Sequence, residues 1–244
     1  MLALQNFNGT ILEIVRRDYR TADVFKKHGI NFCCGGQVSL QEACLARNID
    51  CKIVEEDLSA ATRNIHLPNA LQFSEWKIDF LIDYIINVHH AYVNTTVAPL
   101  QASLVSFVDN HKNKRPFEEL LTLFIKLSTS LLSHNDQEEA IIFPYIRQIE
   151  STHRRKEIYG NLFVRTLRKP LNNMEQEHTS LTTMMADMQT LTDNYNFSEK
   201  ACTTHQVIYR KLREFHEDFL QHKYLENNIL FPKAIDMEKE LLQL

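Results

Sequence analysis

The chain has 244 residues, of which 44% are apolar and 24% are charged, and its formal net charge is −4 with histidine counted as neutral. These values are typical of a globular protein, and the lack of a dominant lysine or arginine cluster argues against nucleic-acid binding. No apolar run reaches the roughly 18 residues that a transmembrane helix needs, so we expect no membrane association. The N-terminal segment MLALQNFNGT lacks the charged and apolar regions of a signal peptide. The five cysteines are not spaced as a disulfide framework, which favours reduced thiols and a cytoplasmic location.

Residues 1–62 are predicted to form a small helical domain, which holds four of the five cysteines and four of the five glycines. An apolar period near 3.6 residues predicts a helix over Ile11–His28. Ser39, followed by Glu42 three positions later, is typical of a capping box that begins a second helix. A third short helix is expected near Asp50.

Residues 75–244 are predicted to form an all-α, up-down four-helix bundle. Apart from Gly160 this region has no glycine, and its apolar residues recur every three or four positions, as in amphipathic helices. Ser198 is the expected N-cap of the last helix, and prolines are expected to kink or end the helices. The four predicted helices cover residues 75–108, 117–148, 155–191 and 199–240.

An internal repeat lies within the predicted bundle. Residues 134–144 read HNDQEEAIIFP and residues 222–232 read HKYLENNILFP. In both copies a histidine is followed four positions later by a glutamate, and then by aliphatic residues, phenylalanine and proline. Because positions i and i+4 share one face of a helix, each imidazole can converge with its carboxylate on one cation.

Two more histidines follow the same spacing. His90 and His178 lie 88 positions apart, as the two HxxxE histidines do, and each precedes its HxxxE histidine by 44 positions. Two equivalent helical hairpins would then contribute four imidazoles and two carboxylates. Two bridging glutamates and two imidazoles per metal suit a dinuclear iron or manganese site with open coordination positions, whereas the lack of thiolates argues against structural zinc. The predicted ligands are His90, His134, Glu138, His178, His222 and Glu226.

Other interpretations of these residues remain open. An isolated HxxxE motif is usually a solvated ion pair, and a histidine on an apolar helix face is often a core residue. His89 adjoins His90, so only one of them can face the site well; the spacing favours His90 and leaves His89 behind the ligands or at the surface. Glu177, next to His178, either supports a ligand or an access route, or is a solvated charge.

The segment Asn31–Gln37 (NFCCGGQ) is predicted to be a turn that carries the adjacent thiols of Cys33 and Cys34. Thiols near the start of a helix have a lowered pKa and react more readily. Metal transfer, thiol redox chemistry and partner docking are all compatible with such a turn. The alternative is a tight turn with small buried thiols.

These motifs resemble the di-iron proteins of the RIC, YtfE or ScdA family, which repair iron-sulfur clusters. The segment FKKHGINFCCGGQVSL is similar to the family's CCGG domain, and IINVHHAY, SHNDQEEAIIFP, MEQEHTSL and QHKYLENNILFP are similar to its haemerythrin-like domain. The resemblance implies two non-haem irons, bridged by an oxo group and two glutamates, on the six residues named above. It further implies cytoplasmic repair of clusters damaged by oxidative or nitrosative stress, through iron donation, chemistry on nitric oxide, or both.

The implied partners are damaged iron-sulfur proteins and nitric oxide or oxygen species, while a homodimer and an enzymatic activity are left open. The alternative function is a haemerythrin-like oxygen- or redox-sensing protein. Oxygen-carrying haemerythrins, however, pair an HxxxE with an HxxxxD motif, and the second motif here is HxxxE. A metal-free bundle that serves only in protein interactions is a third hypothesis.

Overall fold

The computed structural model describes residues 7–32, 36–63, 71–111, 115–155 and 168–242. The chain divides into two compact units, one made of Met1–Asn69 with Tyr195–Leu212 and the other of Ala70–Asn194 with Arg213–Leu244. The domains predicted over residues 1–62 and 75–244 stay predictions. No helix within the described ranges has both the length and the apolar character needed to cross a membrane.

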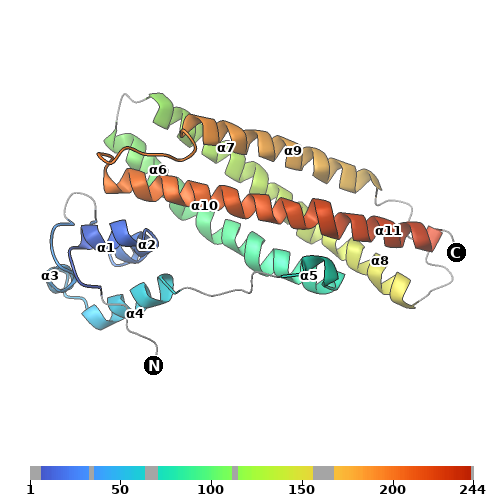
Figure 1. Ribbon diagram of the computed structural model, residues 1–244, viewed down its shortest axis with the longest axis horizontal. Helices are drawn as coiled ribbons and strands as arrows, with labels where there is room; N and C mark the ends of the chain where they lie inside the picture. The colour runs from blue at the N-terminus through green and yellow to red at the C-terminus, as the bar shows by residue number, and fades with distance from the viewer. Residues whose placement is uncertain (1–6, 33–35, 64–70, 112–114, 156–167, 243–244) are drawn as a thin grey trace. The chain divides into compact units, whose positions relative to one another are not determined.

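The first unit contains four short helices, shown in blue to cyan in Figure 1. The single helix predicted over Ile11–His28 is wrong, because Asp18 has an extended backbone and its carboxylate accepts hydrogen bonds from Arg20, which divides the segment in two. The capping box of Ser39 and Glu42 is confirmed. The helices are α1 (Ile11–Arg17), α2 (Thr21–Lys27), α3 (Leu40–Ala46) and α4 (Cys51–Ala61), the last capped by Asp50.

The apolar faces of these helices share one core. Thr10 and Ser39, the N-caps of α1 and α3, also pair in an isolated antiparallel bridge. The core of this unit includes Val207 from the segment Tyr195–Leu212. The other main core residues are Ile11, Ile14, Val15, Phe25, Leu40, Val54 and Leu58.

Within the described ranges, four long helical rods form a bundle and run alternately in opposite directions (Figure 1), as predicted. They belong to the second unit, except that residues 203–212 of the fourth rod are part of the first. Three of the rods change from α to π geometry partway along and then return to α. The first rod is α5 (Ile78–Tyr84), η2 (Ile85–His90) and α6 (Ala91–Asn110), and the second is α7 (Arg115–Gln137), η3 (Glu138–Ile142) and α8 (Phe143–Arg155). The third rod is α9 (Arg168–Leu191), and the fourth is α10 (Thr203–Leu225), η5 (Glu226–Leu230) and α11 (Phe231–Leu242).

Two details of the rods differ from the predictions. The fourth rod begins at Thr203 and not after Ser198, whose hydroxyl instead accepts a hydrogen bond from the backbone N–H of Lys200. Of the two outcomes predicted for the prolines, an end of the helix is wrong for Pro144 and Pro232, while a kink stays a prediction. Each is the second residue of an α-helix that follows a π segment, and a proline in the first turn of a helix is well tolerated.

The apolar ends of the two repeat motifs build the core on one side of the histidine–glutamate cluster. Ile142 and Phe143 from the second rod pack in one cluster with Leu230 and Phe231 from the fourth. Leu81, Ile82 and Ile85 of the first rod belong to the same core, as do Leu171 and Met174 of the third rod. The repeat therefore encodes both polar residues of the site and the apolar layer next to them.

Candidate metal centre

The π segments lie where the predicted ligands lie. His90 is the last residue of η2, while Glu138 and Glu226 are the first residues of η3 and η5. A π segment adds one residue to a helical turn and so changes the direction in which the following side chains point; such segments are frequent at functional sites. His178 comes from α9, which has no such segment within the described residues.

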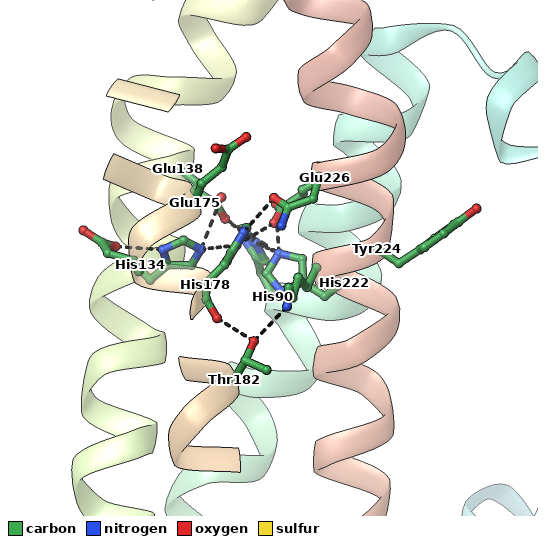
Figure 2. Close-up of polar contacts among 12 residues, drawn as sticks. His90, His134, Glu138, Glu175, His178, Thr182, His222, Tyr224 and Glu226 are labelled. Carbon is green, nitrogen blue, oxygen red and sulfur yellow. Dashed lines mark hydrogen bonds and ion pairs between the residues drawn. The ribbon is translucent and has the colours of Figure 1, made fainter. Parts of the chain in front are cut away.

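The six predicted side chains converge inside the bundle (Figure 2), and none is more than 1% exposed. The histidines form two pairs, with Nε2 of His134 2.8 Å from Nε2 of His178, and Nε2 of His90 3.2 Å from Nε2 of His222. The six residues make two overlapping groups of four, which share Glu138 and Glu226 and whose ligand atoms lie within 4.8 Å of one another.

Each glutamate spans both histidine pairs. Glu138 directs Oε2 towards His90, at 3.4 Å, and Oε1 towards His134, at 3.3 Å. Glu226 directs Oε1 towards His222, at 2.9 Å, and Oε2 towards His178, at 3.1 Å. A carboxylate that offers one oxygen to each pair has the arrangement needed to bridge two cations.

The polar atoms of this cluster fit a cation better than they fit one another. All four carboxylate oxygens are buried and lack a hydrogen bond of normal geometry, and a buried carboxylate without compensation is costly. The paired Nε2 atoms direct their lone pairs or protons at each other. Since neutral imidazoles and carboxylates are ligands for divalent transition metals, cations between the pairs would satisfy both sets of atoms.

The charges in the cluster shift the pKa values of its members. Burial opposes protonation of His134 and His222, but the carboxylates of Glu138 and Glu226 outweigh it and raise the pKa of His134 to about 9 and that of His222 to about 10. Burial likewise raises the pKa values of Glu138 and Glu226, and the nearby imidazoles outweigh it and lower both. The site thus attracts positive charge strongly, whether protons or metal ions supply it.

Hydrogen bonds behind the cluster orient three of the four imidazoles. Nδ1 of His90 lies 2.8 Å from Glu139. His134 has its Nδ1 2.8 Å from Glu177, the residue that the sequence marked as a candidate support. Metal-binding histidines almost always donate their second N–H to such acceptors, which leaves Nε2 free for the metal. The third contact joins Nδ1 of His178 to Oδ1 of Asn227, at 2.9 Å.

The phenylalanines of the two repeat motifs stack on His90 and His178, the two site histidines outside the HxxxE motifs. Phe143 lies nearly parallel to His90, with ring centroids 5.7 Å apart, and Phe231 has the same relationship to His178, at 6.2 Å. Each phenylalanine thus covers one face of an imidazole with an apolar ring. This role explains why phenylalanine follows the HxxxE histidine at the same distance in both copies of the motif.

Several supporting residues were not found from the sequence. Glu139 and Asn227 directly follow the two glutamates of the repeat, so an extension of the 88-residue comparison by one position could have identified them. Lys223 and Thr182 had no such signal. Lys223 donates to the Thr182 hydroxyl, which in turn donates to the backbone carbonyl of His178 (Figure 2), and this chain ties α10 to α9 beside the site.

Other predicted residues lie elsewhere. His89 is buried like His90 but is not in either group of four; its Nδ1 lies 2.8 Å from Asp218. Cys33 and Cys34 lie outside the described residues, so their proposed role is not tested by the structure.

An up-down helical bundle with buried imidazoles and carboxylates of this kind defines a cation-binding protein of the haemerythrin type. A family model described as "Hemerythrin HHE cation binding domain" matches residues 81–234, and the chain belongs to that family. A second model, ScdA_N, described as "Domain of Unknown function (DUF542)", matches residues 7–62. The combination confirms the resemblance that the motifs indicated.

The chain is similar over most of its length to proteins named "Iron-sulfur cluster repair protein YtfE". The protein of Enterobacter sp. (strain 638) is 29% identical over 225 residues, which cover 91% of this chain and 94% of the relative. The protein of Escherichia coli O157:H7 is 29% identical over 219 residues, covering 88% and 91%. The same identity holds over 218 residues, with the same coverage, for Yersinia pestis (strain Pestoides F).

Proposed function

We propose that the bundle holds two iron ions, one between His90 and His222 and the other between His134 and His178, with Glu138 and Glu226 bridging them. The observation that carries this proposal is the span of each carboxylate, which offers one oxygen to each histidine pair. The donor atoms suit manganese as well as iron, and similarity to proteins named for iron-sulfur cluster repair favours iron.

Metal analysis of the purified chain tests this centre directly. We expect about two irons per chain, in line with two sites of two imidazoles each, together with the absorption bands of an oxo-bridged diferric centre. Manganese in place of iron would correct the identity of the metal. A metal content near zero after growth with added iron would reject the centre and leave a metal-free bundle.

We further propose that the protein repairs iron-sulfur clusters damaged by oxidative or nitrosative stress, with damaged iron-sulfur proteins as its partners. Both halves of the chain support this function, since the similarity to the repair proteins covers about nine tenths of the chain. When bound, the two irons would supply metal for transfer to a damaged cluster and open coordination positions for a small ligand. The chain's own residues orient the imidazoles, hold two carboxylates ionised and exclude water. A cytoplasmic location remains part of this proposal.

Restoration of a damaged aconitase-type enzyme tests the repair function. The enzyme is inactivated with peroxide in one sample and with nitric oxide in another, and each is incubated with iron-loaded or chelator-stripped protein. Restoration of both samples, only by loaded protein, supports iron donation; restoration of the nitric-oxide sample alone supports chemistry on nitric oxide. Oxygen binding without restoration of either sample would reject repair and favour the oxygen- or redox-sensing alternative. An equal amount of free iron is the control.

A further inference from the structure

One imidazole of the cluster lacks a partner that the other three have. Nδ1 of His222 is buried and has no hydrogen bond, whereas the Nδ1 atoms of His90, His134 and His178 all have an acceptor at 2.8 to 2.9 Å. A buried N–H without an acceptor is costly, and metal-binding histidines rarely lack one. An acceptor for His222 is therefore to be sought among its neighbours.

His89 has the matching unpaired atom. Its side chain is 1% exposed, its Nδ1 lies 2.8 Å from Oδ1 of Asp218, and its Nε2 is buried without a hydrogen bond. Because the Asp218 carboxylate only accepts, it fixes the proton of a neutral His89 on Nδ1 and leaves Nε2 as an acceptor. A metal on Nε2 of His222 similarly leaves the proton of that ring on Nδ1.

The two rings are direct neighbours. The imidazoles of His89 and His222 are stacked, nearly parallel at 11°, with centroids 5.8 Å apart. Tyr84 also packs edge-on against His89, at 5.5 Å between centroids. Because the N–H of His222 and the lone pair of His89 lie in their ring planes, a rotation of one ring or a single buried water at the ring edges would join this donor to this acceptor.

The repeat supports the same pairing independently. Exchanging the two copies of the repeat moves His134 forward by 88 positions to His222 and its partner Glu177 back by 88 positions to His89. His89 therefore stands in the second half-site where Glu177 stands in the first. Glu177 contacts His134 directly, whereas on the side of His222 the carboxylate of Asp218 contacts only the intervening His89 ring.

We propose that His89, oriented by Asp218, is a positioning residue that accepts the Nδ1–H of His222 through its own Nε2, directly or through one water. The inference rests on the metal centre proposed above and assigns a different supporting residue to each of the two metals. His89 supports the metal between His90 and His222, and Glu177 supports the metal between His134 and His178. Loss of either support should weaken one metal and spare the other.

Release of iron to a strong chelator, followed optically on the loaded full-length chain, tests this proposal. His89→Phe retains a ring without an acceptor and should accelerate the release of one of two irons about 10- to 100-fold, the usual effect of removing such a partner. His89→Gln retains an acceptor near the Nε2 position and should restore slow release. Glu177→Leu should accelerate one iron, and the double variant should accelerate both. Tyr224→Phe, at an exposed position (Figure 2), is the matched control.

The outcomes separate this proposal from the centre itself. A wild-type chain without iron would reject the metal centre. If the wild type holds two irons and His89→Phe releases both as slowly as the wild type does, only the role of His89 is rejected. Equal release from His89→Gln and His89→Phe would also reject it, because the acceptor would then be irrelevant. A double variant that releases only one iron quickly would show that both residues act on the same metal, against the division proposed.

Discussion

Glu139 and Asn227 occupy equivalent places in the two halves of the bundle, each against Nδ1 of a buried histidine that comes from another helix. Glu139 lies 2.8 Å from His90 and Asn227 lies 2.9 Å from His178, and each directly follows a glutamate of the repeat. The contact is thus retained in both halves, with a carboxylate in one and a neutral amide in the other. A carboxylate makes its imidazole a stronger donor to a metal, so His90 is expected to donate more strongly than His178.

Asn227→Leu should weaken metal retention about 10- to 100-fold, because it leaves the Nδ1–H of His178 without an acceptor. Competition with a chelator of known affinity measures the effect. Asn228→Leu, at the exposed neighbouring position, is the control and should retain metal as the wild type does. Equal retention by both variants would contradict a role for Asn227.

Glu138→Gln and Glu226→Gln should each lower the metal content from about two ions per chain to one or fewer, since an amide cannot offer two anionic oxygens to two cations. Metal analysis after loading provides the measurement. Glu175→Gln is the control, because Glu175 forms an ExxH pair with His178 in sequence but lies outside both groups of four. If only Glu175→Gln loses metal, the proposed ligand set is wrong.

Removal of metal should lower the melting temperature of the bundle. A ligand at 100 times its dissociation constant stabilises the folded state by about 2.7 kcal/mol per site, and each kcal/mol changes the melting temperature of a chain of this size by about 2–4 °C. We therefore expect a decrease of about 5–10 °C per site after chelation, measured by calorimetry, with recovery on reloading. Identical transitions of stripped and loaded protein would contradict metal binding in the folded bundle.

Cys33→Ser combined with Cys34→Ser should leave the metal content of the bundle unchanged, because both histidine–glutamate groups lie in the second unit. Repair of the aconitase-type target should fall if the thiols transfer metal or dock the partner. Cys202→Ser serves as the thiol control. Loss of all iron from the double variant would disprove the separation between the thiol segment and the metal centre.

Cys51 should be a slow nucleophile in the folded chain. Burial, the neighbouring thiol of Cys44 and the carboxylate of Glu55 raise the pKa of Cys51 to about 12. Since only the thiolate reacts and an unperturbed thiol has a pKa of about 8.5, alkylation at pH 8 should be at least about a hundredfold slower than in the urea-unfolded chain. Iodoacetamide labelling with mass spectrometry of the Cys51 peptide measures both rates. Equal rates would contradict the raised pKa.

Part of the site was predictable because the sequence contains it twice. The spacing of His134 to Glu138, repeated 88 residues later, identified residues that share a helix face, and the absence of glycine predicted long helices. All six predicted residues meet in the structure. The break between α1 and α2 at Asp18 was missed, because a local side-chain hydrogen bond outweighed an apolar period that continues through it.

The sequence by itself determined the all-α class, the bundle and the six side chains that meet in it, since these depend on period and spacing along single helices. Only the tertiary structure decided which helices bring their side chains into contact. The contacts of His89 with Asp218 and of His134 with Glu177 join residues 129 and 43 positions apart. The π segments also became visible only there, because the apolar period along the sequence does not distinguish one π turn from a continuous α-helix.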